Sequence, residues 1–229
     1  MLEVKDLHVG YGQSEVIHNA NFSAAKGEIL AIMGRNGMGK TTLLKSLIGM
    51  IGARSGSVKV DGVEVNGLPS HRRVRSGMAY VPQGRMIFSS LTVFENLISG
   101  ATGEVTKSTL DEIYALFPVL HEMRKRKGGN LSGGQQQQLA IGRALITGPK
   151  VLVLDEPTEG IQPSIIKDIA KALREIRKMR DLTIVVTEQV VSFMMDVCDR
   201  VMVMDRGRLV HEATRANLDE LKVKQMLAV

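Results

Sequence analysis

Short apolar runs, several of them alternating with polar positions, fill the first third of the chain, a pattern typical of strands. They cover Leu2–Val9, Ser14–Phe22, Glu28–Met33, Ser57–Val65 and Met78–Val81. Asp61-Gly62 divides the fourth run into two alternating arms, and an Asp-Gly pair at such a place predicts a tight hairpin turn. We therefore expect residues 1–84 to be rich in strands, some of them antiparallel.

Between residues 85 and 146 the apolar spacing becomes helical. One helix face, at positions i, i+3, i+4 and i+7, is occupied by Leu110, Ile113, Tyr114 and Phe117. Thr109 and Glu112 have the spacing of a capping box at the start of that helix, and Pro118 is expected to end it. Ser132 and Gln135 have the same spacing at the start of a helix that runs to residue 146. This block reads as a helical insertion.

After residue 147 strands and helices alternate again. Val151–Leu154 and Leu182–Thr187 are continuous apolar runs, as expected for strands buried on both faces, and residues 164–180 between them have helical spacing. The pattern then predicts a short helix, two strands and a helical tail at Val190–Cys198, Arg200–Met204, Arg208–His211 and from Ala213. The whole chain, 1–229, is thus expected to form one α/β domain, with 85–146 inserted between 1–84 and 147–229.

Length and composition agree with one large domain. The chain has 229 residues, of which 44% are hydrophobic, enough for a sizeable core. The single cysteine, Cys198, excludes an internal disulfide, which suits a reducing compartment, and its apolar surroundings predict a buried, inert thiol. No uncharged run reaches the roughly 18–20 residues of a membrane span, and the charged first residues do not resemble a secretory signal. We expect a soluble protein that meets a membrane only through a partner.

The net charge of +6 raises the question of an anionic partner. Aromatic residues make up only 3% of the chain, so a surface for stacking nucleic-acid bases is not expected, and we predict no nucleic-acid partner. The basic residues cluster only in the short runs 72–75 and 124–127. Both runs are interpreted as solvated faces.

The most specific pattern is G-x-x-x-x-G-K-[ST], a phosphate-binding loop. It is formed by Gly34, Arg35, Asn36, Gly37, Met38, Gly39, Lys40, Thr41 and Thr42. A predicted strand precedes it and a helix-compatible run follows, which is the context that the loop requires. Its backbone N–H groups can surround phosphate oxygens, Lys40 can reach the β- and γ-phosphates, and the Thr41 hydroxyl can bind Mg²⁺. The sequence therefore predicts a nucleoside triphosphate site.

Two carboxylates follow a predicted buried strand. Asp155, at the end of that strand, is placed to hold Mg²⁺ through water, and Glu156 can polarise a water for attack on the γ-phosphate. Phosphoryl transfer depends mainly on positioning and on charge stabilisation, so few groups suffice.

A second anion-binding element is predicted at Ser132, Gly133, Gly134 and Gln135, which open a helix N-terminus after Leu131. The chain already contains one phosphate loop, so we interpret this element as a contact to a nucleotide that another subunit holds. Tyr11, between Gly10 and Gly12, has two interpretations at this stage: a ring that stacks on a purine, or a surface aromatic at a strand end.

The order of Tyr11, the phosphate loop, Gln83, the Leu131–Gln135 segment and the Val151–Glu156 segment resembles the ATP-binding subunit of an ABC transporter over the whole chain. The resemblance implies a RecA-like core, an antiparallel β subdomain and a helical subdomain. It also implies two ATP molecules with Mg²⁺ at the interface of a head-to-tail dimer, formed with a sister ATP-binding subunit or, in isolation, with a second copy. The chain would bind membrane permeases at the cytoplasmic face of the inner membrane, and a periplasmic binding protein would be an indirect partner.

The same resemblance implies roles for individual residues. Tyr11 would stack on adenine, and Gln83 would contact Mg²⁺ and the attacking water and couple to the permeases. Glu156 would be the catalytic base or would position the water. Gln189 stands where most members have a histidine, and Gln162 where they have an aspartate. A glutamine amide can donate to the γ-phosphate but carries no charge, so these departures concern hydrolysis rather than binding.

These departures also narrow the expected substrate. Glu188-Gln189 resembles an ATPase of branched-chain amino acid importers, and the segments at 80–85, 131–139 and 159–164 look similar to the urea and short-chain amide branch of that group. We therefore expect an importer of urea or short-chain amides, with branched-chain amino acids as the alternative. Two other classes are a soluble ABC ATPase acting on nucleic acid or the ribosome, and a scaffold that does not hydrolyse ATP.

Overall fold

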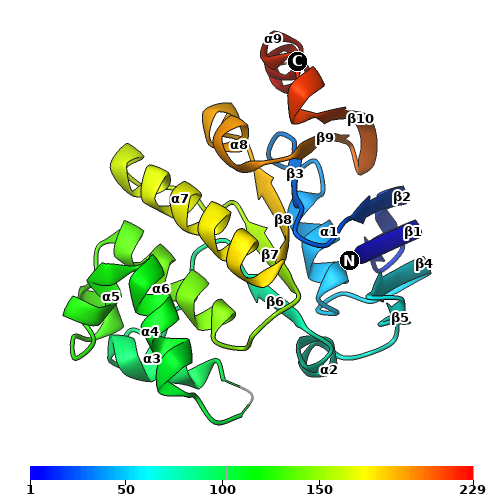
Figure 1. Ribbon diagram of the computed structural model, residues 1–229. Helices are drawn as coiled ribbons and strands as arrows, with labels where there is room; N and C mark the ends of the chain where they lie inside the picture. Colours follow the sequence, from blue (N-terminus) through cyan, green and yellow to red (C-terminus); the bar gives the residue numbers. More distant parts are fainter. Residues whose placement is uncertain (102, 229) are drawn as a thin grey trace.

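The computed structural model describes residues 1–101 and 103–228. Thr102, in the predicted helical insertion, and Val229, at the end of the predicted domain, lie outside the described residues. The described chain forms two sheets and a helical region (Figure 1). The predicted α/β class with an antiparallel sheet and a helical insertion is confirmed.

The smaller sheet is antiparallel, with the order β2-β1-β4-β5. Its strands are β1 (Leu2–Tyr11), β2 (Ser14–Ala24), β4 (Ala53–Val60) and β5 (Val63–Glu64). Asp61 and Gly62 both have positive φ, 48° and 78°, as a type I′ turn between β4 and β5 requires. The hairpin predicted from this dipeptide is therefore confirmed.

The larger sheet has the order β10-β9-β3-β8-β7-β6, and only β10 runs antiparallel to its neighbour. Its strands are β3 (Ile29–Met33), β6 (Met78–Val81), β7 (Val151–Asp155), β8 (Thr183–Glu188), β9 (Arg200–Asp205) and β10 (Arg208–Thr214). Every residue of β3, β7 and β8 is buried. The continuous apolar runs therefore predicted central strands correctly.

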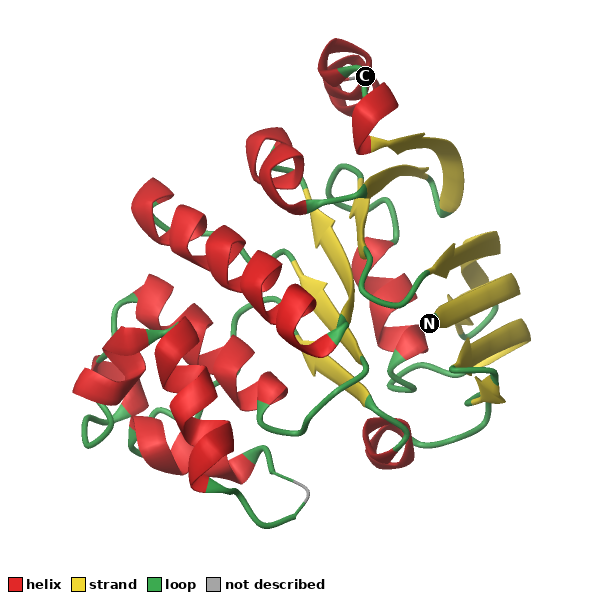
Figure 2. Cartoon of the chain, in the orientation of Figure 1, coloured by secondary structure: helices red, strands yellow, loops and turns green. Residues whose placement is uncertain are grey.

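Two hydrophobic cores cover the two faces of this sheet. On one face Ile29, Ala31 and Met33 pack with α7 (Pro163–Arg180) and α8 (Val191–Val197). On the other face Leu30 and Ile32 pack with α1 (Lys40–Leu47) and the smaller sheet. Figure 2 shows this arrangement, with helices on both sides of the central strands. Among the described residues no helix is both long and apolar enough to cross a membrane.

The helical region contains α3 (Val93–Ser99), α4 (Lys107–Leu116), α5 (Pro118–Glu122) and α6 (Gly133–Leu145). The capping box predicted at Thr109 and Glu112 is wrong, because α4 begins three residues earlier. Its N-cap is Thr106, whose hydroxyl accepts from the N–H of Thr109 at 3.2 Å. Glu112 instead accepts from Arg180 Nε of α7 at 2.6 Å, which ties the helical region to the core. Pro118 ends α4 as predicted and also begins α5.

The C-terminal tail also differs in its bounds. Strand β10 continues to Thr214, so the helical tail expected from Ala213 starts later, with a 3₁₀ turn at Arg215–Asn217 and α9 at Glu220–Ala228. Cys198 is fully buried, and burial raises the pKa of its thiol to about 11, in agreement with an inert side chain.

The interpretation of residues 72–75 as a solvated face is confirmed at Arg72 and Arg75, which are exposed, and is wrong at Arg73. These residues form most of α2 (Ser70–Arg75), and the Arg73 side chain is only 3% exposed. Its Nη1 donates to the carbonyl oxygens of Ser46 and Leu47 at 2.8 Å, and its Nε to that of Leu68 at 3.0 Å. A helix leaves its last carbonyls unpaired, and Arg73 satisfies two of them at the end of α1, the helix that follows the phosphate loop.

Arg73→Met is expected to lower the free energy of unfolding by about 2–4 kcal/mol, since buried carbonyls lose a charged donor. Arg75→Met, on the exposed side of α2, is the matched control and should change it by less than about 0.5 kcal/mol. Urea denaturation of the three proteins measures the difference. Equal midpoints for the two variants would contradict this role of Arg73.

Candidate functional site

The phosphate loop leaves the carboxyl end of β3 and enters α1. Gly37 and Gly39 have φ of 80° and 104°, a region that side chains rarely adopt, so these two positions need glycine. A Cβ on Gly34 would lie 2.7 Å from the carbonyl oxygen of Met204, so this glycine allows the loop to approach β9 closely. Gly39 is the N-cap of α1 and offers no side-chain acceptor, which leaves the first N–H groups of that helix available for an anion.

Lys40 points back into this loop. Its side chain is 4% exposed, and Nζ donates to the carbonyl oxygens of Gly34 at 2.6 Å and Arg35 at 3.0 Å. The same Nζ forms an ion pair with Glu156 Oε1 at 2.9 Å. Glu156 is 8% exposed, so both charges are buried and each is the other's direct counter-charge. The structure thus brings together the loop lysine and the carboxylate that the sequence predicted as its catalytic partner.

Asp155 ends β7 and accepts three hydrogen bonds. Its Oδ1 accepts from Thr41 Oγ1 at 3.2 Å and Thr187 Oγ1 at 2.8 Å, and its Oδ2 from Tyr80 OH at 3.1 Å. The predicted metal-binding pair, Thr41 and Asp155, therefore lies side by side. Burial, followed by the charge of Asp155, raises the pKa of Tyr80 above its ordinary value, so its hydroxyl keeps the proton that it donates.

Tyr80 and Thr187 are site residues that sequence reasoning missed. Each lies on a strand that pairs in parallel with β7: Thr187 is the register partner of Asp155 in β8, and Tyr80 is on β6 beside Val153. A polar residue near the end of each neighbouring strand could have indicated these two site residues. That indication requires knowing which strands are neighbours, and the hydrophobic pattern does not provide the strand order.

Gln189 positions Glu156. Its Nε2 donates to both carboxylate oxygens of Glu156 at 3.1 Å, and to Asn36 Oδ1 of the phosphate loop at 2.8 Å. Glu156 itself has a positive φ of 46°, an unusual conformation for this residue type. The side-chain amide of Gln189 thus links the phosphate loop to the carboxylate of Glu156.

Glu188 is a further residue at the site, and the sequence assigned it no role there. It is 2% exposed, and its Oε1 accepts from the N–H of Thr158 at 2.8 Å while its Oε2 accepts from the N–H of Gln189 at 2.9 Å. A buried carboxylate bonded in this way fixes the chain after β8 to the chain after β7. Glu188 therefore supports the positions of both Glu156 and Gln189.

The second predicted anion element is built as expected. Ser132 Oγ accepts from the N–H of Gln135 at 3.3 Å, and Gln135 Oε1 accepts from the N–H of Ser132 at 2.9 Å, so the capping box is confirmed. A Cβ on Gly134 would lie 2.7 Å from Ile165, so α6 and α7 can pack closely only with glycine there. This helix N-terminus belongs to the helical region, whereas α1 lies on the opposite side of the central sheet (Figure 1). The element and the phosphate loop therefore do not form one site within one chain.

Three further residues singled out by the sequence, Gln83, Tyr11 and Gln162, have no hydrogen bond or ion pair to Lys40, Asp155 or Glu156 among the residues that the structure describes. Gln83 Nε2 donates to Glu159 Oε2 at 3.0 Å, and within the described part of the chain it makes no hydrogen bond to Thr41 or Asp155. Tyr11, at the end of β1, is 52% exposed, so its ring face is open to a ligand. Gln162 is the N-cap of α7 and makes no side-chain capping bond, a role that an aspartate would fill.

A family model described as ABC transporter matches residues 17–159. The branched-chain amino acid transport ATP-binding protein BraG of Pseudomonas aeruginosa is 40% identical over 98% of this chain and 97% of its own length. LivF of Archaeoglobus fulgidus, described as a probable branched-chain amino acid transport ATP-binding protein, is 37% identical over 96% and 94%. LptB of Escherichia coli K12, from a lipopolysaccharide export system, is 31% identical over 93% and 90%.

Solved structures agree in fold with the described chain. A nucleotide-free ATP-binding cassette from an ABC transporter superposes with a TM-score of 0.84 at 25% identity, covering 100% of this chain and 95% of that one. An ATP-binding cassette in its ADP conformation gives 0.83 at 25% identity, covering 100% and 94%.

Proposed function

The chain belongs to the ABC transporter family, as an ATP-hydrolysing ATP-binding subunit, and we propose that it powers the import of branched-chain amino acids. The observation that carries the proposal is the 40% identity to BraG along nearly the full length of both chains. BraG and LivF are both named for branched-chain amino acid transport. Neither they nor LptB is named for urea or amides. Branched-chain amino acids, the alternative substrate class, therefore replace the urea or short-chain amides that were expected first.

The site fits ATP with Mg²⁺. The open N–H groups of the loop and the buried ammonium of Lys40 suit the phosphates, and Tyr11 offers an exposed ring for adenine. Thr41 and Asp155 supply oxygen ligands, and the described residues contain no cluster of three acidic, histidine or cysteine side chains that could hold a metal. That donor set suits Mg²⁺, which usually keeps waters and substrate phosphates as ligands and would neutralise charge on the β- and γ-phosphates.

In the hydrolysis that we propose, Lys40 exchanges its contacts with Glu156 and the loop carbonyls for phosphate oxygens. Glu156, released from the ion pair, accepts a hydrogen bond from the attacking water and acts as base or water-positioner. Gln189 keeps that carboxylate in place and is close enough to Asn36 to donate toward the γ-phosphate instead. The water oxygen bonds to the γ-phosphorus as the bond to the ADP oxygen breaks.

The site is completed by a second cassette. The Ser132–Gln135 helix N-terminus is exposed at Ser132 and faces no nucleotide loop of its own chain, so it is free to contact an ATP held by a partner. That partner is a sister ATP-binding subunit in the transporter, or a second copy of this chain in isolation.

The permease contact is proposed at the loop after β6. Met86 and Phe88 are 67% and 52% exposed there, beside a cavity of about 190 Å³ lined in part by Tyr80, Arg85 and Arg143. Exposed apolar side chains next to a cavity suit a helical segment of a membrane subunit. Gln83 lies in the same loop, so this contact would couple the permease to the site from the cytoplasmic face of the membrane, with a periplasmic binding protein acting on the far side.

Tyr11→Ala is expected to weaken ATP binding about tenfold, because stacking of a base on an aromatic ring contributes ~1–3 kcal/mol. Binding of inorganic triphosphate, which has no base, should not change. Tyr11→Phe is the control and should bind ATP as the unaltered protein does. Fluorescence titration with both ligands measures the effect. Equal loss for the two ligands would show that Tyr11 supports the loop rather than the adenine.

Uptake of labelled leucine and labelled urea tests the transport proposal. Cells that lack this protein should lose leucine uptake and keep urea uptake, and the unaltered gene should restore the former. Undiminished leucine uptake in those cells, with other leucine carriers deleted, would overturn the substrate class. Loss of urea uptake instead would reinstate the first expectation.

A further inference from the structure

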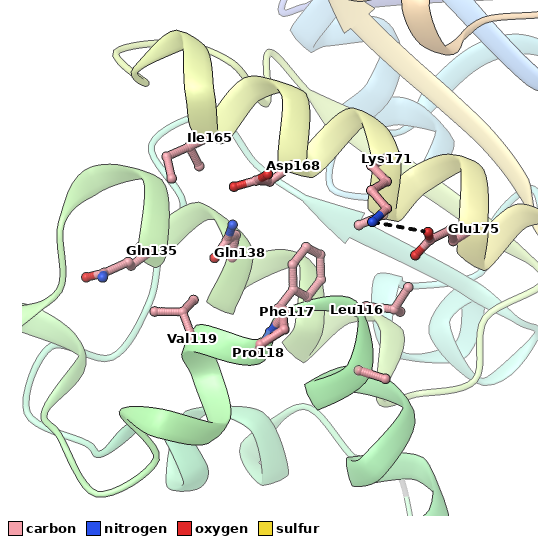
Figure 3. Close-up of a pocket in the computed structure, with 12 residues that line it drawn as sticks. Leu116, Phe117, Pro118, Val119, Gln135, Gln138, Ile165, Asp168, Lys171 and Glu175 are labelled. Atoms are coloured by element: carbon pink, nitrogen blue, oxygen red, sulfur yellow. Dashed lines mark ion pairs between the residues drawn. The ribbon is translucent and has the colours of Figure 1, made fainter.

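A cavity separates the helical region from the core helix α7. Its volume is about 410 Å³, and it is lined by the end of α4, the start of α5, the first turns of α6 and one face of α7 as far as Glu175 (Figure 3). None of its lining residues belongs to the phosphate loop or to the cluster around Asp155. It is therefore separate from the phosphate loop and the Asp155 cluster, although Gln135 of the Ser132–Gln135 element belongs to its lining.

Gln138 is the polar group at the base of this cavity. It is 4% exposed, its amide points from α6 into the cavity, and its Oε1 has no hydrogen-bond partner (Figure 3). A buried amide oxygen without a donor is unfavourable, and such groups in folded proteins are usually satisfied by protein, water or ligand. That oxygen is closed to solvent, so a ligand in the cavity reaches the amide nitrogen of Gln138, and Gln138 calls for a molecule that carries a hydrogen-bond acceptor.

The α7 side of the cavity carries both acidic and basic side chains. Asp168 reaches toward Gln138, and one turn further Lys171 pairs with Glu175 at 3.9 Å (Figure 3). This pair is loose, with side chains 71% and 48% exposed, so it can be exchanged for ligand contacts at little cost. The opposite wall is apolar and contains Phe117 and Val119.

We propose that this cavity binds a small zwitterionic amino acid with an apolar side chain. Its ammonium would donate to Asp168, its carboxylate would accept from Gln138 Nε2 and pair with Lys171, and its side chain would pack on Phe117 and Val119. A phosphate or nucleotide is disfavoured by the two carboxylates, and a plain cation by Lys171 and the apolar wall. An aliphatic amino acid matches all three parts of the lining.

The position of the cavity gives such binding a consequence for ATP turnover. Helix α6 begins with the Ser132–Gln135 element, and α7 follows the segment that carries Glu156, so a ligand between them contacts Gln135 of that element and the helix that follows Glu156. The imported amino acid would then slow the ATPase as it accumulates. This link to transport rests on the proposed function, whereas binding in the cavity does not.

Calorimetric titration of the full chain with L-leucine, isoamylamine and 4-methylvalerate tests the binding site. L-Leucine should bind saturably, with a Kd below about 1 mM, and the two analogues, which each lack one charged group, should bind at least about tenfold more weakly. No saturable leucine binding would overturn the proposal. Equal binding of the amine and leucine would overturn the zwitterion and leave an amine site.

Variants locate the ligand. Asp168→Asn should weaken leucine binding at least about tenfold. Gln138→Leu should weaken it too and, because it removes an unsatisfied amide, should raise the Tm rather than lower it. Lys167→Gln, on the same helix but outside the lining, is the matched control and should bind as before. Unchanged leucine affinity in both cavity variants would place the ligand elsewhere. Since the readout is binding, this failure is distinct from loss of leucine transport.

Discussion

Glu156→Gln is expected to lower ATP turnover by about 10²–10⁴-fold while ATP binding persists, since the amide keeps the shape of the carboxylate but cannot take a proton from water. Glu156 is buried against Lys40 at 2.9 Å and held by Gln189 at 3.1 Å. The glutamine removes the negative charge that competes with phosphate for Lys40. ATP affinity should therefore be equal or higher, and an ATP-bound dimer should accumulate.

Single-turnover kinetics and an ATP-binding titration separate the two effects, and size-exclusion chromatography with ATP reports the dimer. Glu64→Gln, an exposed carboxylate on β5, is the matched control and should turn over ATP normally. Turnover within about threefold of normal in Glu156→Gln would remove Glu156 from the catalytic role. The Glu156 carboxylate would then serve only as the ion-pair partner of Lys40.

Lys40→Met is expected to weaken ATP binding by about 10²–10³-fold, because the only buried ammonium in the described phosphate loop is lost. It should also destabilise the protein without nucleotide. Glu156 would remain buried without its counter-charge, which costs about 2–4 kcal/mol when Gln189 still donates to it.

A double-mutant cycle distinguishes these effects. In Lys40→Met with Glu156→Gln no unpaired charge remains, so the double variant should be more stable to urea than Lys40→Met alone. ATP binding should stay weak in the double variant. Additive destabilisation would contradict a direct energetic coupling of the two buried charges.

Features encoded by adjacent residues were predictable from the chain alone. The phosphate loop, the Asp61-Gly62 turn and the Ser132–Gln135 capping box each depend on contacts within a few residues, and the structure shows all three in their predicted local context. The buried central strands were equally clear, because a strand covered on both faces needs apolar side chains throughout.

The incorrect predictions concern residues for which two capping patterns were possible, or residues whose interaction partner lies far away in the sequence. Thr106 and Thr109 both suit an N-cap. In the structure Thr106 is the N-cap, and Glu112 pairs with Arg180 of α7. Arg73 looked like part of a charged surface, but it satisfies the carbonyls of a helix about 26 residues earlier in the chain.

The sequence by itself indicated a nucleotide-binding chain, and it predicted which loop, carboxylates and helix N-terminus would take part. It did so because phosphate binding requires particular residues at fixed local spacing. Only the tertiary structure decided how these parts work together. Lys40 meets Glu156, Gln189 holds that carboxylate, and Tyr80 and Thr187 meet Asp155 because parallel strands distant in sequence end at one edge of the sheet. Strand order, which no local pattern encodes, creates the site.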